Sequence, residues 1–215
     1  MNDRPAQGSP WNYDRGEIIA DGVIHIVGVC FGLIGAVTLI VLAGRATKVV
    51  AIEPVFVYAV GLLAMLGFSA AYNLWPVSEM KWILRRFDHS AIFVLIAGTY
   101  TPFMTQLKIS LASGGLLTGL WVTAGLGVVL KLVLPGRFDR VAVVLYLLLG
   151  WSGAMFCGSI IASLPRLTLW LLAAGGALYS IGVIFHLWES LRFQNAIWHA
   201  FVLFAAGCHY AAVVN

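Results

Sequence analysis

The sequence predicts an all-α, polytopic membrane protein, a bundle of seven transmembrane helices. Of its 215 residues, 61% are hydrophobic and only 10% are charged, and the mean hydropathy is +0.94. A soluble domain carries about 25% charged residues, so too few are present here to cover a surface in water. The apolar residues form runs of about 20 or more, the length that a helix needs to cross a bilayer. Since lipid leaves no partner for free backbone groups, and period-two alternation is missing, these runs are expected to be helices.

One transmembrane domain, residues 18–214, is expected to follow a cytoplasmic tail, residues 1–17. The spans are expected at 18–43, 51–74, 88–106, 112–133, 141–163, 167–187 and 194–214. Pro76, Pro135 and Pro165 stand just after the second, fourth and fifth runs, where a residue without an N–H readily ends a helix. The first run is longer than the apolar core of a signal peptide and has no clear cleavage site, so we expect it to remain as the first span.

The lysines and arginines predict the orientation. With the N-terminus in the cytoplasm, four basic residues fall outside, Arg45, Lys48, Lys108 and Arg166, and the other nine fall inside. The positive-inside rule favours this arrangement, which places the C-terminus of a seven-span chain outside the inner or plasma membrane. The net charge of +4 is small and scattered, so no nucleic-acid partner is expected. Membrane lipid is the expected partner; no soluble partner is evident, and the oligomeric state stays open.

Ionisable side chains inside the spans indicate where the functional site lies. Such a group costs about 2.5–3.5 kcal/mol in the bilayer unless it faces the interior of the bundle. Glu17, Asp21 and His25 are spaced by four residues and so form one stripe along the first helix. We expect this stripe to point inward at the cytoplasmic end of the bundle, as part of a polar pocket.

Five further polar residues lie at the same level of three other spans. Ser69 and Asn73 end the second span, Asp88 opens the third, and Asn195 and His199 open the seventh. We expect them to converge in a buried pocket that offers an imidazole, a carboxylate, a hydroxyl and two amides. Imidazole and carboxylate are ligands that zinc uses. A carboxylate beside a metal-bound water can act as a general base, which makes Ser69 and Asp88 the candidate catalytic residues.

Structural roles compete with these functional ones. Asp88 follows two arginines and is equally well interpreted as the N-cap of a helix. Asp21 and His25 can form a hydrogen-bonded pair with no binding role. Asn73 and Asn195 can hydrogen-bond to each other and so join the second helix to the seventh, which is more typical of amides than metal ligation.

Four stretches of the chain resemble one family. The most specific are FDHSAIFVLIAGTYTPF (87–103) and NAIWHAFVLFAAGCHYAAV (195–213), and GEIIADGVIHIVG (16–28) and SAAYN (69–73) also fit. Together they resemble the hemolysin III family, the bacterial branch of the progestin and adipoQ receptor superfamily, to which alkaline ceramidases are more distantly related. The resemblance covers nearly all of the chain and implies a seven-helix bundle with a cytoplasmic N-terminus.

The resemblance also implies a zinc site. The family pattern has Ser-x3-His at the end of the second helix, an Asp at the start of the third and His-x3-His at the start of the seventh, with three histidines holding the metal. Ser69, Asp88 and His199 match this pattern, whereas Asn73 and Asn195 stand where the family has histidines. An amide oxygen is a weak zinc ligand compared with an imidazole, so the single matching histidine is not expected to hold zinc tightly.

Either the metal is lost or other groups replace the missing ligands. His186 and His89 are the imidazoles expected nearby. His186 is also interpreted, more simply, as an amphipathic ring at the membrane interface beside Trp188.

Three functions are compatible with the sequence. A pore or channel is the property after which the bacterial family is named, and it is the main expectation that the resemblance implies. The distant ceramidase relatives and the Ser/Asp/His pocket imply a metal-dependent membrane hydrolase acting on a lipid amide or ester. A non-catalytic sensor of membrane lipid state would need no metal. Polar residues at one end only argue against a wide pore, and the two asparagines leave enzymatic activity undecided.

Overall fold

The computed structural model describes residues 13–45, 52–106, 111–134, 136–156 and 163–215, and within these ranges it contains helices and no strands. The elements are α1 (Arg15–Arg45), α2 (Ile52–Leu74), α3 (Glu79–Gln106), α4 (Leu111–Val133), α5 (Asp139–Trp151), the short 3-10 helix η1 (Ser152–Phe156), α7 (Arg166–Leu187) and α8 (Gln194–Val214). The all-α prediction is confirmed.

Five of these helices are long and apolar enough to cross a membrane: α1, α2, α4, α7 and α8. The multi-pass membrane prediction is therefore confirmed, while the count of seven spans stays a prediction. α3 and α5 are not among these five helices, for different reasons. α3 opens with several charged residues and is less apolar than the others, and the α-helical part of α5 has only 13 residues.

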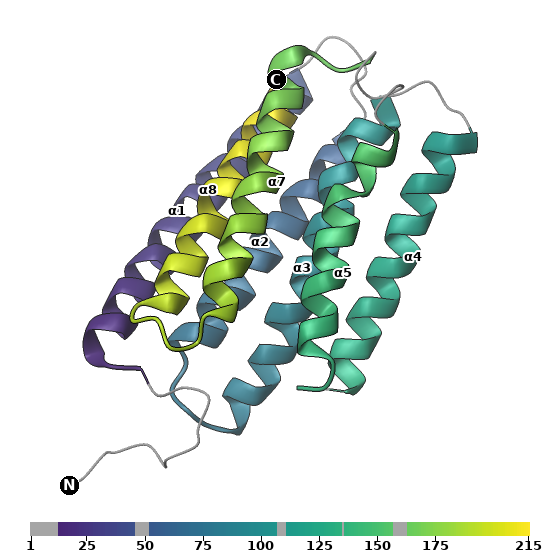
Figure 1. The fold of residues 1–215 in the computed structure, drawn as a ribbon. Helices are drawn as coiled ribbons and strands as arrows, with labels where there is room; N and C mark the ends of the chain where they lie inside the picture. Colours follow the sequence, from purple (N-terminus) through teal and green to yellow (C-terminus); the bar gives the residue numbers. More distant parts are fainter. Residues whose placement is uncertain (1–12, 46–51, 107–110, 135, 157–162) are drawn as a thin grey trace, which may run out of the picture.

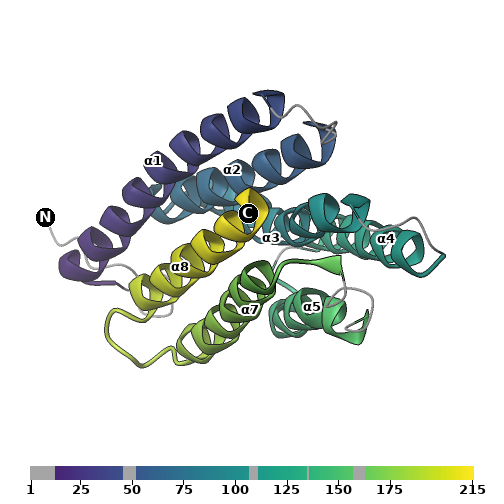
Figure 2. The ribbon, with the colours of Figure 1, turned by 90° about the horizontal axis from the view of Figure 1, so that it is seen from above.

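The helices run side by side in one bundle (Figure 1). Consecutive helices pack as neighbours from α1 to α4, and α8 packs against both α7 and α1. Seen from above, α8 lies between the α1–α2 pair and α7, while α3 lies between α2 and α4 (Figure 2). This arrangement brings the start of α1, the end of α2 and the start of α8 to the same end of the bundle.

Small residues let α2 and α3 approach closely. A Cβ added at Gly61 would lie 3.3 Å from both the Leu95 Cα and the Val94 carbonyl oxygen, so only a glycine fits this contact easily. Gly98 meets the α2 backbone in the same way, with the Val57 carbonyl oxygen 3.4 Å from an added Cβ. Interfaces of this kind are typical of membrane helices. The close approach holds the first half of α2 against the second half of α3.

Two predicted boundaries differ from the structure. α3 begins at Glu79 rather than at residue 88, because its first turns contact the end of α2: the Lys81 Nζ donates to the carbonyl oxygens of Asn73 at 3.2 Å and Trp75 at 2.8 Å. The fifth span was expected over 141–163, but α5 ends at Trp151. There the chain tightens into η1, and the Gly153 N–H donates to the Tyr100 hydroxyl at 2.9 Å. Residues 157–162 lie outside the described part.

A buried cluster of charges joins α3, α4 and α5 near their ends. The Asp139 carboxylate accepts from the Lys131 Nζ at 2.6 Å and from the Arg85 guanidinium at 2.6 Å. Lys131 is only 2% exposed. Asp139 is therefore the counter-ion that allows a lysine to be buried at this position.

Candidate functional site

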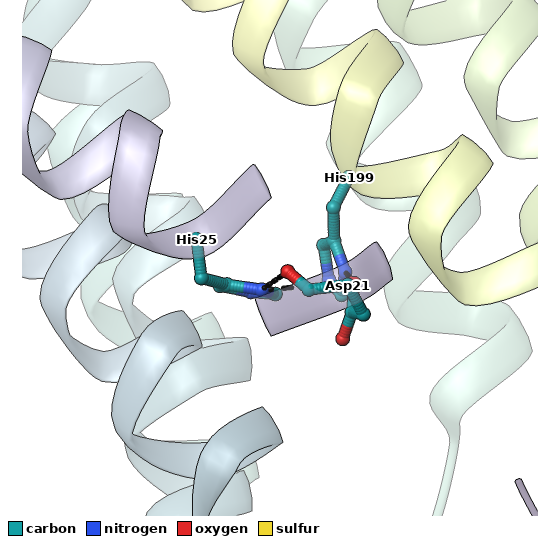
Figure 3. Close-up of side chains that lie close together, drawn as sticks. All are labelled: Asp21, His25 and His199. Carbon is teal, nitrogen blue, oxygen red and sulfur yellow. Dashed lines mark hydrogen bonds and ion pairs between the residues drawn. The ribbon is translucent and has the colours of Figure 1, made fainter. Parts of the chain in front are cut away.

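Two helices, α1 and α8, meet at the Asp21 carboxylate, which is 9% exposed. Its Oδ1 accepts a hydrogen bond from the His199 Nδ1 of α8 at 2.6 Å, and its Oδ2 accepts one from the Asn195 Nδ2 at 2.9 Å. The His25 Nδ1, one turn along α1, lies 3.6 Å from Oδ1. Figure 3 shows both imidazoles turned toward this one carboxylate. Asp21 thus links α1 to α8 through charge-assisted hydrogen bonds, which are stronger than neutral ones.

His25 connects this carboxylate to α2. Its Nδ1 lies 2.8 Å from the Asp21 carbonyl oxygen, and its Nε2 lies 3.2 Å from the Ser69 Oγ. Because a carbonyl oxygen can only accept, Nδ1 carries the hydrogen, and a neutral His25 presents the lone pair of Nε2 to the Ser69 hydroxyl. The His25 ring also packs edge-on against the ring of His199, with centroids 4.4 Å apart.

The two asparagines hydrogen-bond to each other. The Asn195 Nδ2 donates to the Asn73 Oδ1 at 3.1 Å, and the Asn73 Nδ2 donates to the Ser69 carbonyl oxygen at 2.9 Å. This is the interhelical bond between α2 and α8 that the sequence offered as the alternative to metal ligation. Since the Asn73 oxygen is already an acceptor, it is poorly placed to be a ligand as well.

Asp88 lies beside this cluster on α3. Its carboxylate lies 3.3 Å from the His89 Nδ1, and Asp88 and Ser69 line the same cavity. The N-cap interpretation of Asp88 is wrong, because α3 starts more than two turns earlier, at Glu79.

Glu17, a predicted pocket residue, and His186, the possible replacement ligand, lie apart from the cluster. Glu17 and Asp14 form a capping box: the Asp14 Oδ1 accepts from the Glu17 N–H at 2.9 Å, and the Glu17 Oε2 accepts from the Asp14 N–H at 2.8 Å. The Glu17 Oε1 also accepts from the Phe193 N–H at 2.9 Å, so this residue attaches α1 to the α7–α8 turn.

The ring of His186 packs on Trp198, 5.0 Å between centroids, and its buried Nδ1 has no hydrogen-bond partner among the described residues.

Asp21, His25 and His199 form a group that could hold a metal ion. Their ligand atoms lie within 4.8 Å of one another, and all three residues are buried or nearly so. Ligands of tetrahedral zinc stand about 3.4 Å apart, so small rotations of these side chains would complete three ligand positions. The sequence missed this group, because His25 was considered only as a polar member of the stripe while His186 was considered as the replacement ligand.

At the family's own ligand positions the fit is poor. Asn73 and Asn195 are hydrogen-bonded to each other, to Ser69 and to Asp21, and only His199 offers an imidazole. Zinc prefers imidazole nitrogen to an amide oxygen. The donor chemistry therefore argues that any bound cation uses Asp21 and His25 together with His199.

We expect the double substitution Asn73→His/Asn195→His to create a tighter zinc site than the natural chain has. It would place three imidazoles on α2 and α8 at positions that already contact one another. Elemental analysis of purified wild type and double mutant measures this directly, with Ser69→Ala added to test whether the hydroxyl matters. Equal zinc content in wild type and double mutant would show that these two positions do not limit metal binding.

A cavity of about 1070 Å³ opens beside the cluster. At one end it is lined by Ser69, Asn73, Asp88 and His199, and it continues along α7 past Leu172 to Trp170. Most of its remaining wall is apolar. The hydroxyl, amide, carboxylate and imidazole side chains thus lie at one end of a long cavity whose wall is mostly apolar.

A second cavity, of about 320 Å³, lies on the other side of the two asparagines. Asp21, Asn73, Asn195 and Lys81 line it, and Asn73 and Asn195 line the large cavity as well. Lys81 is partly desolvated, so burial lowers its pKa while the Asp21 charge opposes that shift. Tyr13 borders both cavities, and burial raises its pKa to about 12, so its hydroxyl stays protonated at neutral pH.

The fold and the site define a class of protein: a multi-pass α-helical membrane protein with a buried carboxylate–imidazole cluster at one end of an apolar cavity. The sequence model of the family described as "Haemolysin-III related" matches residues 17–210. The chain therefore belongs to the hemolysin III family, which is related to the progestin and adipoQ receptors.

Individual relatives agree with this assignment. The chain is 36% identical over 187 residues to the "Hemolysin-3 homolog" of Bacillus subtilis (strain 168), covering 87% of this chain and 88% of that one. It is 34% identical over 187 residues to the "Hemolysin-3" of Bacillus cereus, covering 87% and 85%. It is 27% identical over 165 residues to the human "Monocyte to macrophage differentiation factor", covering 74% and 68%. No solved structure matches the chain.

Proposed function

We propose that this protein is a membrane-embedded hydrolase that cleaves an ester or amide bond of a lipid. The observation that carries the proposal is the large cavity, which has hydroxyl, carboxylate and imidazole groups at one end and mostly apolar walls elsewhere. An acyl chain would occupy the apolar part. Its carbonyl carbon would then lie at the level of Ser69, Asp88 and His199.

The size and chemistry of the cavity support a lipid substrate. Small-molecule sites typically measure about 300–1,000 Å³ and combine apolar walls with a few placed polar groups. At about 1070 Å³ this cavity has room for a long amphiphile. The smaller cavity, with Asp21 and Lys81 in its wall, would admit water and release the polar product.

A metal-assisted form of this reaction is the alternative that zinc analysis tests. Asp21, His25 and His199 would hold the cation, and a bound zinc would supply a Lewis acid and lower the pKa of a water molecule. The preceding zinc experiment and a chelator control on hydrolysis separate this form from a metal-free one.

A pore or channel is the second candidate, and one observation favours it. The large cavity reaches from the cluster at the start of α8 to Arg166 at the start of α7, two helices that begin at opposite ends of the bundle. The "Hemolysin-3" name of the Bacillus cereus relative points the same way. Release of a trapped dye from liposomes containing the purified chain, without loss of intact lipid, would favour the pore over the hydrolase.

A sensor without catalysis would bind the same lipid and leave it whole. Mass spectrometry of lipid extracted from reconstituted protein distinguishes these cases. Cleaved lipid that accumulates with time supports the hydrolase, and a constant amount of intact bound lipid supports the sensor.

Filling the cavity is expected to abolish lipid cleavage. Ala173 of α7 lines the cavity, so Ala173→Trp would occupy the space proposed for the acyl chain. Ala174, the next residue, is exposed and does not line it, so Ala174→Trp is the matched control. We expect cleavage of a lipid ester and amide panel to be lost in the first variant and retained in the second. Equal activity of both variants would show that the substrate does not enter this cavity.

A further inference from the structure

We propose that Ser69 is the nucleophile of this reaction and that His25 is its general base, so that cleavage passes through an acyl-serine. The inference rests on the proposed hydrolase function and names the atom that attacks. It differs from cleavage by a metal-activated water, because the attacking oxygen belongs to the chain itself.

The geometry is that of a serine–histidine pair held by a third group. The Ser69 Oγ lies 3.2 Å from the His25 Nε2, and the His25 Nδ1 is held by the Asp21 carbonyl oxygen at 2.8 Å. This second bond fixes the tautomer in which Nε2 can accept the hydroxyl proton. The Asp21 carboxylate, 3.6 Å from Nδ1, would stabilise the imidazolium that forms. A hydroxyl becomes a competent nucleophile when an adjacent base takes its proton in this way.

Ser69 faces the substrate and His25 stands behind it. Ser69 lines the large cavity, whereas His25 lines neither cavity and is buried against α2 and α8. The proton acceptor is thereby shielded while the hydroxyl meets the carbonyl carbon. The Asn73 Nδ2, which donates to the Ser69 carbonyl oxygen at 2.9 Å and lies 3.5 Å from the Ser69 Oγ, is the amide donor that we assign to the oxyanion that attack creates.

The reaction balances with water as the only co-substrate. The Ser69 oxygen bonds to the carbonyl carbon while its proton passes to the His25 Nε2. The ester C–O or amide C–N bond then breaks, and the leaving oxygen or nitrogen takes that proton. Water attacks the acyl-serine in the second half, gives a proton to His25, and releases the fatty acid as the proton returns to Ser69.

Asp88 is the competing acceptor, since it lines the same cavity as Ser69. The hydroxyl has one proton to donate, and at 3.2 Å it lies closer to the unprotonated His25 Nε2 than the other donor, the Asn73 Nδ2 at 3.5 Å. We therefore assign the proton to His25 and expect Asp88 to position Ser69. Substitution of each residue tests this assignment.

The test uses the full chain in lipid nanodiscs with an alkyl fluorophosphonate, a probe that phosphonylates activated serines as fluoride leaves. We expect labelling of wild type at Ser69, located by peptide mass spectrometry, and none in Ser69→Ala. His25→Gln should slow labelling by about 100-fold or more, the lower range of general-base contributions, and Asp88→Asn should slow it less. Ser90→Ala is the control, because Ser90 is a buried α3 serine outside the cluster. The melting temperature of each variant verifies that it is folded.

The outcomes separate this inference from the function on which it rests. Lipid cleavage that a chelator stops, in a wild type that the probe does not label, would overturn the serine mechanism and leave the hydrolase standing. Labelling that depends on Asp88 and not on His25 would overturn the assignment of the base. Ser69 labelling that depends on His25, with no cleavage of any lipid in the panel, would support the reactive pair and contradict the proposed hydrolysis.

Discussion

Asp139→Asn is expected to destabilise the folded protein by about 3 kcal/mol, because it leaves a buried ammonium without its counter-ion. The Lys131 Nζ lies 2.6 Å from the Asp139 Oδ1 and the lysine is 2% exposed, so water cannot replace the lost partner. Arg85 is more exposed than Lys131 and can be hydrated. Because Asp139 is itself 34% exposed, we place the effect at the lower end of the usual range for a broken buried pair. The melting temperature in detergent or nanodiscs measures the change.

The matched control removes the lysine charge at the same time. Lys131→Met keeps the length of the side chain, so Asp139→Asn/Lys131→Met should be more stable than Asp139→Asn alone. Equal melting temperatures for the single and the double variant would show that the buried ammonium is not the source of the loss.

The same pair predicts a dependence on pH. Burial alone would raise the pKa of Asp139, but the hydrogen bond from Lys131 and the charges of Arg85 and Lys131 outweigh it and hold that pKa below its ordinary value of 3.8. A carboxylate whose pKa is lowered by folding contributes stability above its unfolded pKa and loses it as the pH falls through its folded pKa. The melting temperature of wild type should therefore fall more steeply below about pH 4 than that of Asp139→Asn.

Asp21→Ala is expected to have the largest effect on the site. It removes the acceptor of the His199 Nδ1–H and of one Asn195 N–H, and it removes the charge beside His25. Each unsatisfied buried group costs about 1–3 kcal/mol, so we expect a loss of several kcal/mol in stability, together with loss of lipid cleavage. Measured melting temperatures and turnover in nanodiscs report the two effects separately.

Asp14→Ala is the control for Asp21→Ala. Asp14 is also an acid at the start of α1 and is also hydrogen-bonded, but it is exposed. Loss of this cap should lower the melting temperature less than Asp21→Ala does and leave cleavage unchanged. If Asp14→Ala lost as much turnover as Asp21→Ala, the Asp21 carboxylate would have no specific role in cleavage. The start of α1 would then affect turnover only by holding the helix in place.

The sequence predicted the helices and their order because a helix that crosses a membrane needs a run of about 20 apolar residues, and such runs are visible in the sequence. It also predicted the level of the polar cluster, since residues four apart on α1, α2 and α8 share a helix face. The stripe of Asp21 and His25 and the pair of Asn195 and His199 are examples, and the structure brings their side chains together.

The spacing of residues along a helix could not predict which side chains of distant segments contact each other. Nothing local distinguishes His25 from His186 as the neighbour of His199, because that depends on α8 packing with its first turns against α1. Lys131 entered the sequence analysis only as one of the nine basic residues expected inside, and only the position of Asp139 one loop later explains its burial. The early start of α3 was missed because its charged first turns are supported by contacts with the end of α2 rather than by apolar residues.

The most direct test of the polar cluster as the reactive end of a lipid cavity is lipid cleavage by His199→Ala in reconstituted membranes. His199 lines the cavity and holds Asp21 in place, whereas His209 lines the same cavity ten residues further along α8 and lies outside the cluster. We expect His199→Ala to lose about 100-fold or more in turnover, as for other groups that support general-base catalysis, and His209→Ala to stay near wild type. Turnover that survives in His199→Ala at the wild-type rate would contradict a catalytic role for this cluster.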